Sequence, residues 1–333
     1  MPTITSGLRL RSGILTTMAT LIWPLARQVT RLGVRPVQEA FTSLYGSASG
    51  LTEVGDQIFH QDTSGIQGVA ETGDKFGEFL ATGDFNCDGR SDLAVGAPQE
   101  AIGTVVEAGA VNIIYGSASG LSATTNQIWD QDSPNINDFA EANDNFGGAL
   151  VAGNFDGNSI SGHACMDLAI GIPGEDFGLA SDTGAVSVLY GTSSGVSATN
   201  DQFWHQSVTG VPDTAETDDE FGTRLWSMVG TYDDLFILVP GDSLNGSTGV
   251  AVYIGGSPSG LDAIQQSVQI QPPQVPPIPT PWEESKSCGF SSSEFLNCND
   301  AIAWCAEHKG DWQCHMSCGG GQCCQGTCTS AAT

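Results

Sequence analysis

A six-residue phrase returns along this chain at a nearly constant interval, and this periodicity limits the possible folds more than any other feature of the sequence. Gly-Ser-Ala-Ser-Gly-Leu occupies residues 46–51 and 116–121, and related phrases occupy residues 191–196 and 256–261. The four copies therefore begin at Gly46, Gly116, Gly191 and Gly256. A unit of this kind cannot bury its apolar surface alone, so such chains stack their units side by side around a continuous core.

Two further landmarks recur in a fixed order with this phrase. Three of the phrases close a run rich in β-branched residues, and the first three phrases are followed by Gln, an apolar residue and an aromatic residue, at 57–59, 127–129 and 202–204. Between these landmarks stand Phe-Gly pairs at 76–77, 146–147 and 221–222, which are followed by Gly-Ala-Pro at 96–98, Gly-Ile-Pro at 171–173 and Val-Pro at 239–240. Short apolar runs broken by Gly, Asp and Asn predict four strands per unit and no long helix.

Together these phrases resemble the FG-GAP repeat family, whose members in integrin α subunits form the blades of a β-propeller. The resemblance covers roughly residues 42–263. It implies an all-β fold, a partial β-propeller of four-stranded blades, and a role in adhesion or ligand binding at an extracellular surface. Three recognisable units are fewer than the about four to eight blades that closed propellers use.

The segment between the first Phe-Gly and Gly-Ala-Pro elements has the composition of a cation-binding loop. In Asp84–Asp92, oxygen-bearing side chains stand at positions 1, 3, 5 and 9, and glycine stands at position 6. Hard cations take oxygen ligands from such loops, and position 7 supplies a main-chain carbonyl. The family resemblance assigns calcium to this pattern, with ligands from Asp84, Asn86, Asp88, Asp92 and the carbonyl of Arg90. The alternative is an acidic turn that holds no metal.

The later copies of this loop depart from the pattern. Asn154 and Asp156 begin the second copy correctly, but Asp167 stands five positions beyond the place that the spacing from Asp84 to Asp92 would give it. The five extra residues, which include Cys165, either loop out or abolish the site, so Asn154, Asp156 and Asp167 are weaker candidates for calcium. The third copy, residues 230–235, has lost most of the loop, and we expect it to bind no metal.

Charge excludes several classes of partner. Of 10 basic and 38 acidic residues, five basic residues and one acidic residue precede residue 42, which leaves 5 basic and 37 acidic residues in the remainder. Such a surface repels nucleic acid and anionic lipid and attracts cations and basic partners. No run of about 20 apolar residues that could span a membrane occurs. The predicted partner is a protein or carbohydrate ligand at a surface.

Residues 1–41 differ from the rest of the chain, because they are basic and lack acidic loops. If the coding DNA is read one base earlier, residues 14–28 become compatible with the metal loop and the strand after it, with glycine forced at Met18 and alanine at Trp23. Ile14 precedes Asp84 by the same offset that separates the phrases at 46–51 and 116–121. We hypothesise that this segment is a frameshifted remnant of another repeat, disordered or irregular, with its true start upstream. The alternative is a signal peptide, although none is clearly identifiable in this reading frame.

The C-terminal part has a different composition. Residues 264–284 hold a proline-rich stretch that predicts a semi-rigid linker, and residues 285–333 hold eight of the ten cysteines. So dense a set predicts disulfides and an extracellular location, although a zinc site using His308 or His315 is conceivable. The 105 possible pairings leave the connectivity open. Cys87 and Cys165 could pair across adjacent units, but two unrelated thiols are the simpler interpretation.

No nucleophile, phosphate-binding or metalloprotease motif occurs, so the chain is expected not to be an enzyme. The leading interpretation is an extracellular, calcium-binding, integrin-α-like repeat protein. Because FG-GAP repeats also accompany phospholipase-type enzymes, the resemblance allows an accessory propeller of a secreted hydrolase whose catalytic domain is missing. A non-functional gene fragment is the third alternative.

Overall fold

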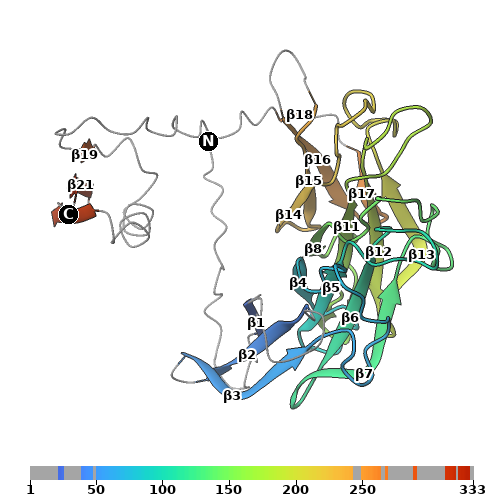
Figure 1. Ribbon diagram of the computed structural model, residues 1–333, viewed down its shortest axis with the longest axis horizontal. Helices are drawn as coiled ribbons and strands as arrows, with labels where there is room; N and C mark the ends of the chain where they lie inside the picture. Colours follow the sequence, from blue (N-terminus) through green and yellow to red (C-terminus); the bar gives the residue numbers. More distant parts are fainter. Residues whose placement is uncertain are drawn as a thin grey trace. The chain divides into compact units, whose positions relative to one another are not determined.

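The computed structural model describes residues 22–25, 39–47, 50–242, 249–263, 267–268, 288–290, 312–319 and 322–330. The chain divides into two compact units, residues 1–273 and 274–333. The described residues form β-strands, turns and loops with no helix, so the all-β prediction is confirmed (Figure 1).

The first unit is a series of antiparallel sheets, each of which corresponds to one sequence unit and is called a blade here. Blade 1 has three strands: β1 (Ile22–Leu25), β2 (Phe41–Ser47) and β3 (Gly50–Phe59). Blade 2 has the order β4 (Leu80–Gly83), β5 (Asp92–Ala97), β6 (Ala110–Ser117) and β7 (Gly120–Trp129).

Blades 3 and 4 repeat this plan. Blade 3 consists of β8 (Ala149–Gly153), β11 (Asp167–Ile172), β12 (Ala185–Thr192) and β13 (Gly195–Trp204). Blade 4 consists of β14 (Arg224–Met228), β15 (Asp234–Val239), β16 (Val250–Ser257) and β17 (Gly260–Asp262), with β18 (Ser267–Val268) also paired to β16. The expectation of four strands per unit is therefore confirmed for blades 2 to 4.

The recurring six-residue phrase forms the hairpin between the third and fourth strands of blades 2 to 4 and between β2 and β3 of blade 1. In blade 2, Ser117 pairs with Gly120 at the tip, and the register shifts at a bulge between Ile113 and Tyr115. Gly120 has a φ of 113°, a conformation in which an L side chain is strained. A Cβ at this position would also collide with the Tyr45 hydroxyl of blade 1, so the second glycine of the phrase permits both the turn and the contact between blades.

The same hairpin also receives the side chains that join neighbouring blades. Gln57 of β3 accepts a hydrogen bond from the Leu121 amide (2.9 Å) and donates one to the Leu121 carbonyl (2.9 Å). Equivalent tyrosine–glutamine pairs, Tyr115 with Gln127 and Tyr190 with Gln202, reach Val196 of blade 3 and Leu261 of blade 4. The glutamine of one unit and the hairpin of the next therefore recur together because they form one interface.

Apolar surface is buried mainly between blades. Every residue of β5 and of β11 is buried, because each of these strands lies in a sheet with a neighbouring blade on both sides. The core clusters accordingly combine residues of successive blades, such as Ala169 of blade 3 with Ile237 of blade 4. Stacking of units, which the repeat spacing predicted, is what completes the core.

Blade 1 carries the same register as its neighbour. Trp23 of β1 pairs with Leu44 of β2, and Leu93 of β5 pairs with Ile114 of β6. Trp23 precedes Leu93, and Leu44 precedes Ile114, by the same number of positions that separates the first two copies of the phrase. This is the offset at which the frameshift hypothesis aligns residues 1–41 with the following repeat, and the hypothesis itself remains a prediction.

The second unit is described through three strands, in the order β19 (Cys288–Phe290), β21 (Gln322–Ser330) and β20 (Trp312–Gly319). The predicted disulfides of this module and the linker at 264–284 lie outside what the structure describes, apart from β18. Within the described residues, no helix is long and apolar enough to cross a membrane.

Candidate functional site

The predicted metal loop joins the first two strands of blade 2. Because Gly83 and Asp92 are paired across β4 and β5, the residues between them form one turn at the end of these strands, in which residues 88–91 are exposed and Phe85 and Cys87 are buried. Cys87 and Gly89 adopt φ values of 59° and 85°, so the chain bends sharply at these two positions. The predicted glycine of position 6 is therefore one of the residues that permit the turn.

Asp84 and Asn86, two of the predicted ligands, accept hydrogen bonds from backbone amides of this turn. Asp84 accepts hydrogen bonds from the amides of Asp88 (2.9 Å) and Gly89 (2.7 Å) through its two carboxylate oxygens. Asn86 accepts a bond from the Asp88 amide (3.1 Å). The exposed Asp88 accepts from the Arg90 amide and pairs with the Arg90 guanidinium, both at 2.9 Å. The side-chain oxygens of Asp84 and Asn86 thus accept from amides inside the turn, whereas the Asp88 carboxylate is exposed and engaged by Arg90.

Asp92, at position 9, has a different environment from the other predicted ligands. It is fully buried and accepts hydrogen bonds from the amides of Phe85 and Gly116, both at 2.8 Å. Burial raises the pKa of Asp92 to about 7. Because Gly116 begins the hairpin phrase, Asp92 fastens the metal loop to the hairpin of the same blade.

This arrangement recurs in the later blades. Asp167 accepts from the amides of Phe155 (2.7 Å) and Gly191 (2.9 Å), and burial raises its pKa to about 7. Asp234 accepts from the amide of Gly256 (3.1 Å) in blade 4. Asp167 therefore occupies the place of Asp92 in spite of its longer spacing in the sequence.

The five-residue insertion in the second loop forms a small hairpin. Its strands, β9 (Ser159–Ile160) and β10 (His163–Ala164), pair with each other. The hairpin extends toward blade 2, where a Cβ built on Gly89 would lie 2.6 Å from Cε1 of His163. The extra residues thus loop out and leave Asn154, Asp156 and Asp167 in one loop.

The second loop contains a candidate that the sequence analysis missed, namely Asn158. It stands at position 5, the place of Asp88 in the first loop, and it carries an amide where the first loop carries a carboxylate. Its amide nitrogen donates to the Gly191 carbonyl (3.2 Å), and its backbone N–H donates to Asp156 (2.9 Å). The side-chain oxygens of Asn154 and Asn158 are both buried and have no hydrogen-bond partner.

The third copy joins β14 to β15 by a short turn. Asp233 accepts from the amides of Gly230 (3.1 Å) and of Asn154 (2.9 Å), so its carboxylate links blade 4 to the second loop. Neither Thr231 nor Tyr232 supplies a carboxylate. The expectation that this copy binds no metal remains a prediction.

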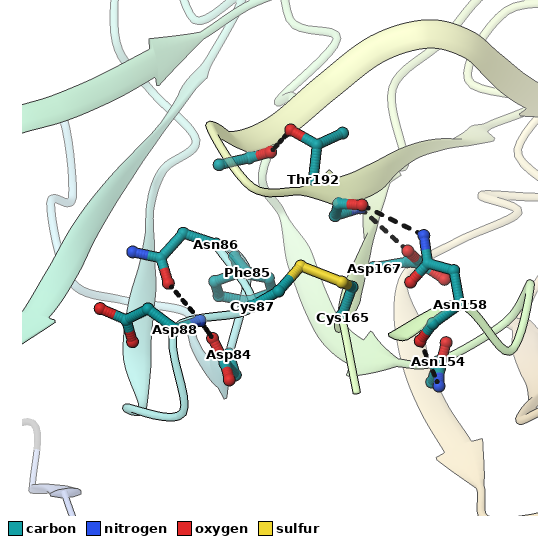
Figure 2. The surroundings of a disulfide bond; sticks show 12 residues. Asp84, Phe85, Asn86, Cys87, Asp88, Asn154, Asn158, Cys165, Asp167 and Thr192 are labelled. Atoms are coloured by element: carbon teal, nitrogen blue, oxygen red, sulfur yellow. Dashed lines mark hydrogen bonds between the residues drawn. A yellow bond between two sulfur atoms is a disulfide. The ribbon is translucent and has the colours of Figure 1, made fainter. Parts of the chain in front are cut away.

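A disulfide between Cys87 and Cys165 joins the first and second loops (Figure 2). The Cα atoms of the two cysteines are 4.7 Å apart, although 78 positions separate them in the sequence. The interpretation of two unrelated thiols was therefore wrong. Stacking of blades brings the cysteines together, because the Met166 amide beside Cys165 donates to the carbonyl of Asp84 (2.9 Å).

The donor sets of both loops fit a hard divalent cation. All side-chain atoms that could coordinate a metal in these loops are carboxylate or amide oxygens, and calcium takes about six to eight oxygen ligands. In the second loop, Asn154 and Asn158 each bury an acceptor oxygen with no donor, a costly state that a cation would relieve. In the first loop, each oxygen that accepts a backbone N–H keeps a second lone pair for a metal.

Comparison with known families agrees with the landmarks and the blades. The family model described as FG-GAP repeat matches residues 76–113, which span β4, β5 and the first half of β6. The chain therefore contains an FG-GAP repeat. The match covers the first metal loop together with the Phe-Gly and Gly-Ala-Pro elements.

Curated proteins similar to this chain carry the description phosphatidylinositol-glycan-specific phospholipase D. The protein of Rattus norvegicus is 34% identical over 116 residues, which is 34% of this chain and 13% of the relative. The protein of Bos taurus is 32% identical over 152 residues (45% and 16%), and that of Homo sapiens is 34% identical over 131 residues (39% and 14%). The matches therefore span about a seventh of the length of these relatives.

Proposed function

We propose that this chain is a calcium-binding, non-catalytic FG-GAP propeller module of an extracellular protein. The observation that carries the proposal is the second loop, where the buried oxygens of Asn154 and Asn158 have no partner beside Asp156 and Asp167. Such acceptors are rare in folded proteins unless water or an ion satisfies them. The first loop supports the proposal with the oxygens of Asp84, Asn86, Asp88 and Asp92 and the Arg90 carbonyl.

In this proposal calcium stabilises the edge of the propeller. Each loop connects two strands of one blade and contacts the next blade, through Cys87 and Cys165 in one case and through Asn154 and Asp233 in the other. A cation held in a loop would offset the repulsion among its carboxylates and order these contacts. The disulfide supports an extracellular location, because oxidising compartments preserve such bonds.

Thermal unfolding tests the calcium proposal. Calcium at about 100 times its dissociation constant should stabilise the chain by about 2.7 kcal/mol, which raises Tm by roughly 5–10 °C. Asp88→Ala should remove the part of this Tm increase that comes from calcium in the first loop. Asn158→Leu, which keeps the side-chain volume, should remove the part that comes from the second loop.

The control for this measurement is magnesium at the same concentration, since magnesium requires a tighter octahedral site. The same Tm with calcium and with a chelator, in the parent chain and in both variants, would contradict the proposal.

The similarity to phosphatidylinositol-glycan-specific phospholipase D favours one biological setting, namely an accessory module of a hydrolase. In this setting the module would recognise the glycan of the lipid and not the lipid charge, because the acidic surface repels anionic headgroups. Flotation with vesicles provides the test. In calcium, the chain should bind vesicles that carry a glycosylated phosphatidylinositol and should not bind vesicles of plain phosphatidylinositol. Equal binding to both vesicles, or to neither, would contradict the accessory role.

A further inference from the structure

A second set of buried acidic groups lies at the opposite edge of the blades from the metal loops. The loops follow the first strand of each blade, whereas this set lies before the first strand and after the second. In blade 2, Asp74 precedes β4 and Glu100 follows β5, and the antiparallel pairing of these strands places both residues at one edge. The two kinds of site are thus separated by the length of the strands.

The first set, called cluster 1, consists of Gln61, Glu71, Asp74 and Glu100. One carboxylate oxygen each of Glu71, Asp74 and Glu100 lies within 4.8 Å of the others. Gln61 follows the last strand of blade 1 and donates its amide N–H to Glu100, while the Glu71 amide donates to Asp74 (2.6 Å). Asp74 and Glu100 are buried, and Glu71 is exposed at the mouth of the cluster.

The same arrangement occurs at each of the next two blade junctions. Cluster 2 consists of Gln131, Glu141, Asp144 and Glu175, and cluster 3 consists of Gln206, Glu216, Asp219 and Asp242. In both, the glutamine donates to the last residue of the set, and the amide of the first glutamate donates to the aspartate. The second and third clusters therefore share these hydrogen bonds with the first, whereas among the described residues three carboxylate oxygens lie within 4.8 Å of one another in cluster 1 alone.

The glutamines provide an independent sign of a missing ligand. Gln131 and Gln206 are each 1% exposed, and the amide of each is held against the carboxylates by its Nε2 donor. Gln206 lies close to Asp219 as well as Asp242. Yet the Oε1 atoms of Gln131 and Gln206 are buried with no hydrogen-bond partner. A buried acceptor within a set of acceptors requires a donor or a cation.

Charge leads to the same requirement. Burial raises the pKa of Glu100 to about 7, and burial together with the neighbouring Asp138 carboxyl raises the pKa of Glu175 well above its usual range. The ion pairs formed within the described residues, Lys75–Glu78 and Arg90–Asp88, include no carboxylate of clusters 1 or 2. The negative charge must therefore be reduced by protons or balanced by a cation.

We infer that these clusters are a second class of cation site, one at each of three blade junctions, and that they bind calcium. Carboxylates and a glutamine carbonyl are oxygen ligands that calcium accepts, and the exposed glutamate leaves each site open to solvent. A bound ion would join the segment leaving one blade to the loop of the next. This inference is independent of the calcium proposed for the loop at Asp84–Asp92.

Equilibrium dialysis with radioactive calcium, using the full chain, separates the two classes of site. Asp88→Ala combined with Asp156→Ala removes a carboxylate from each metal loop. We expect this loop-silenced chain still to bind between about one and three calcium ions. Adding Glu141→Ala, which alters an exposed side chain of cluster 2, should lower the number bound by about one, or the affinity of one site at least about tenfold.

Glu53→Ala, which removes one negative charge from the exposed part of β3, is the matched control and should leave binding unchanged. Gln131→Leu is the second variant, because it removes the amide oxygen without adding charge, and circular dichroism verifies its fold. Absence of bound calcium in the loop-silenced chain at millimolar concentrations would overturn the inference. Unchanged binding in both Glu141→Ala and Gln131→Leu would also overturn it, because protons alone would then neutralise the carboxylates. Failure of the loop proposal is distinct, since the parent and the loop-silenced chain would then bind equally.

Discussion

Cys87 is the residue whose role differs most between the sequence and the folded chain. Within the sequence it stands among four candidate calcium ligands, and it adopts a positive φ of 59° in the turn. In the structure it is 5% exposed and bonded to Cys165, so it holds the loop against the neighbouring blade. The disulfide thereby restrains the turn in which Asp84, Asn86 and Asp88 lie.

Removal of this disulfide should destabilise the chain strongly. The cross-link closes a loop of 78 residues, and chain entropy assigns such a loop about 4 kcal/mol of stabilisation. Cys87→Ser with Cys165→Ser should therefore lower the free energy of unfolding in urea by about that amount and should weaken calcium binding at the first loop. Peptide mapping without reductant should recover one cross-linked peptide that contains both cysteines. Recovery of two free thiols would contradict the assignment.

At the scale of elements, glycines control how the loop after the second strand meets the next blade. Gly109 has a φ of 88°, and a Cβ at this position would collide with the backbone N and O of Phe146. Gly184 has the same relation to Phe221. The Phe-Gly landmark of one blade is therefore received by a glycine of the blade before it.

A matched pair of substitutions separates backbone strain from this contact. Gly103 lies in the same loop with a φ of 64°, but a Cβ there would meet nothing within 4 Å. Gly103→Ala should cost about 1 kcal/mol through strain alone, whereas Gly109→Ala should cost about 3 kcal/mol or more because the blades must also separate. Urea unfolding measures both. Equal costs would show that Phe146 does not press on Gly109 in solution.

At the scale of the whole molecule, the blades form an array held by three repeated kinds of contact. The tyrosine–glutamine pairs reach the hairpins, the metal-loop carbonyls accept from the next blade, and the glutamines of clusters 1 to 3 reach the next loop of carboxylates. Acidic residues are prominent in the last two kinds of contact. The large negative charge of the chain is thus partly structural, and cations are expected to be part of the folded protein. A role in adhesion follows only from the resemblance to integrin repeats and remains a prediction.

The sequence by itself determined the repeat, the strands and the position of the loop at Asp84–Asp92, because these depend on residues close together in the chain; metal binding by this loop stays a prediction. The short apolar runs, the turn glycines and the spacing from Asp84 to Asp92 each lie within one blade, so they can be recognised in the sequence alone. The second loop was only partly predicted, since the length of the insertion concealed that Asp167 and Asn158 occupy the places of Asp92 and Asp88.

Only the tertiary structure decided what joins one blade to the next. The Cys87–Cys165 bond and the hydrogen bond from Gln131 to Glu175 link residues 78 and 44 positions apart. Their proximity depends on how the sheets stack, and stacking is governed by apolar burial between blades, which has no short-range signature in the sequence.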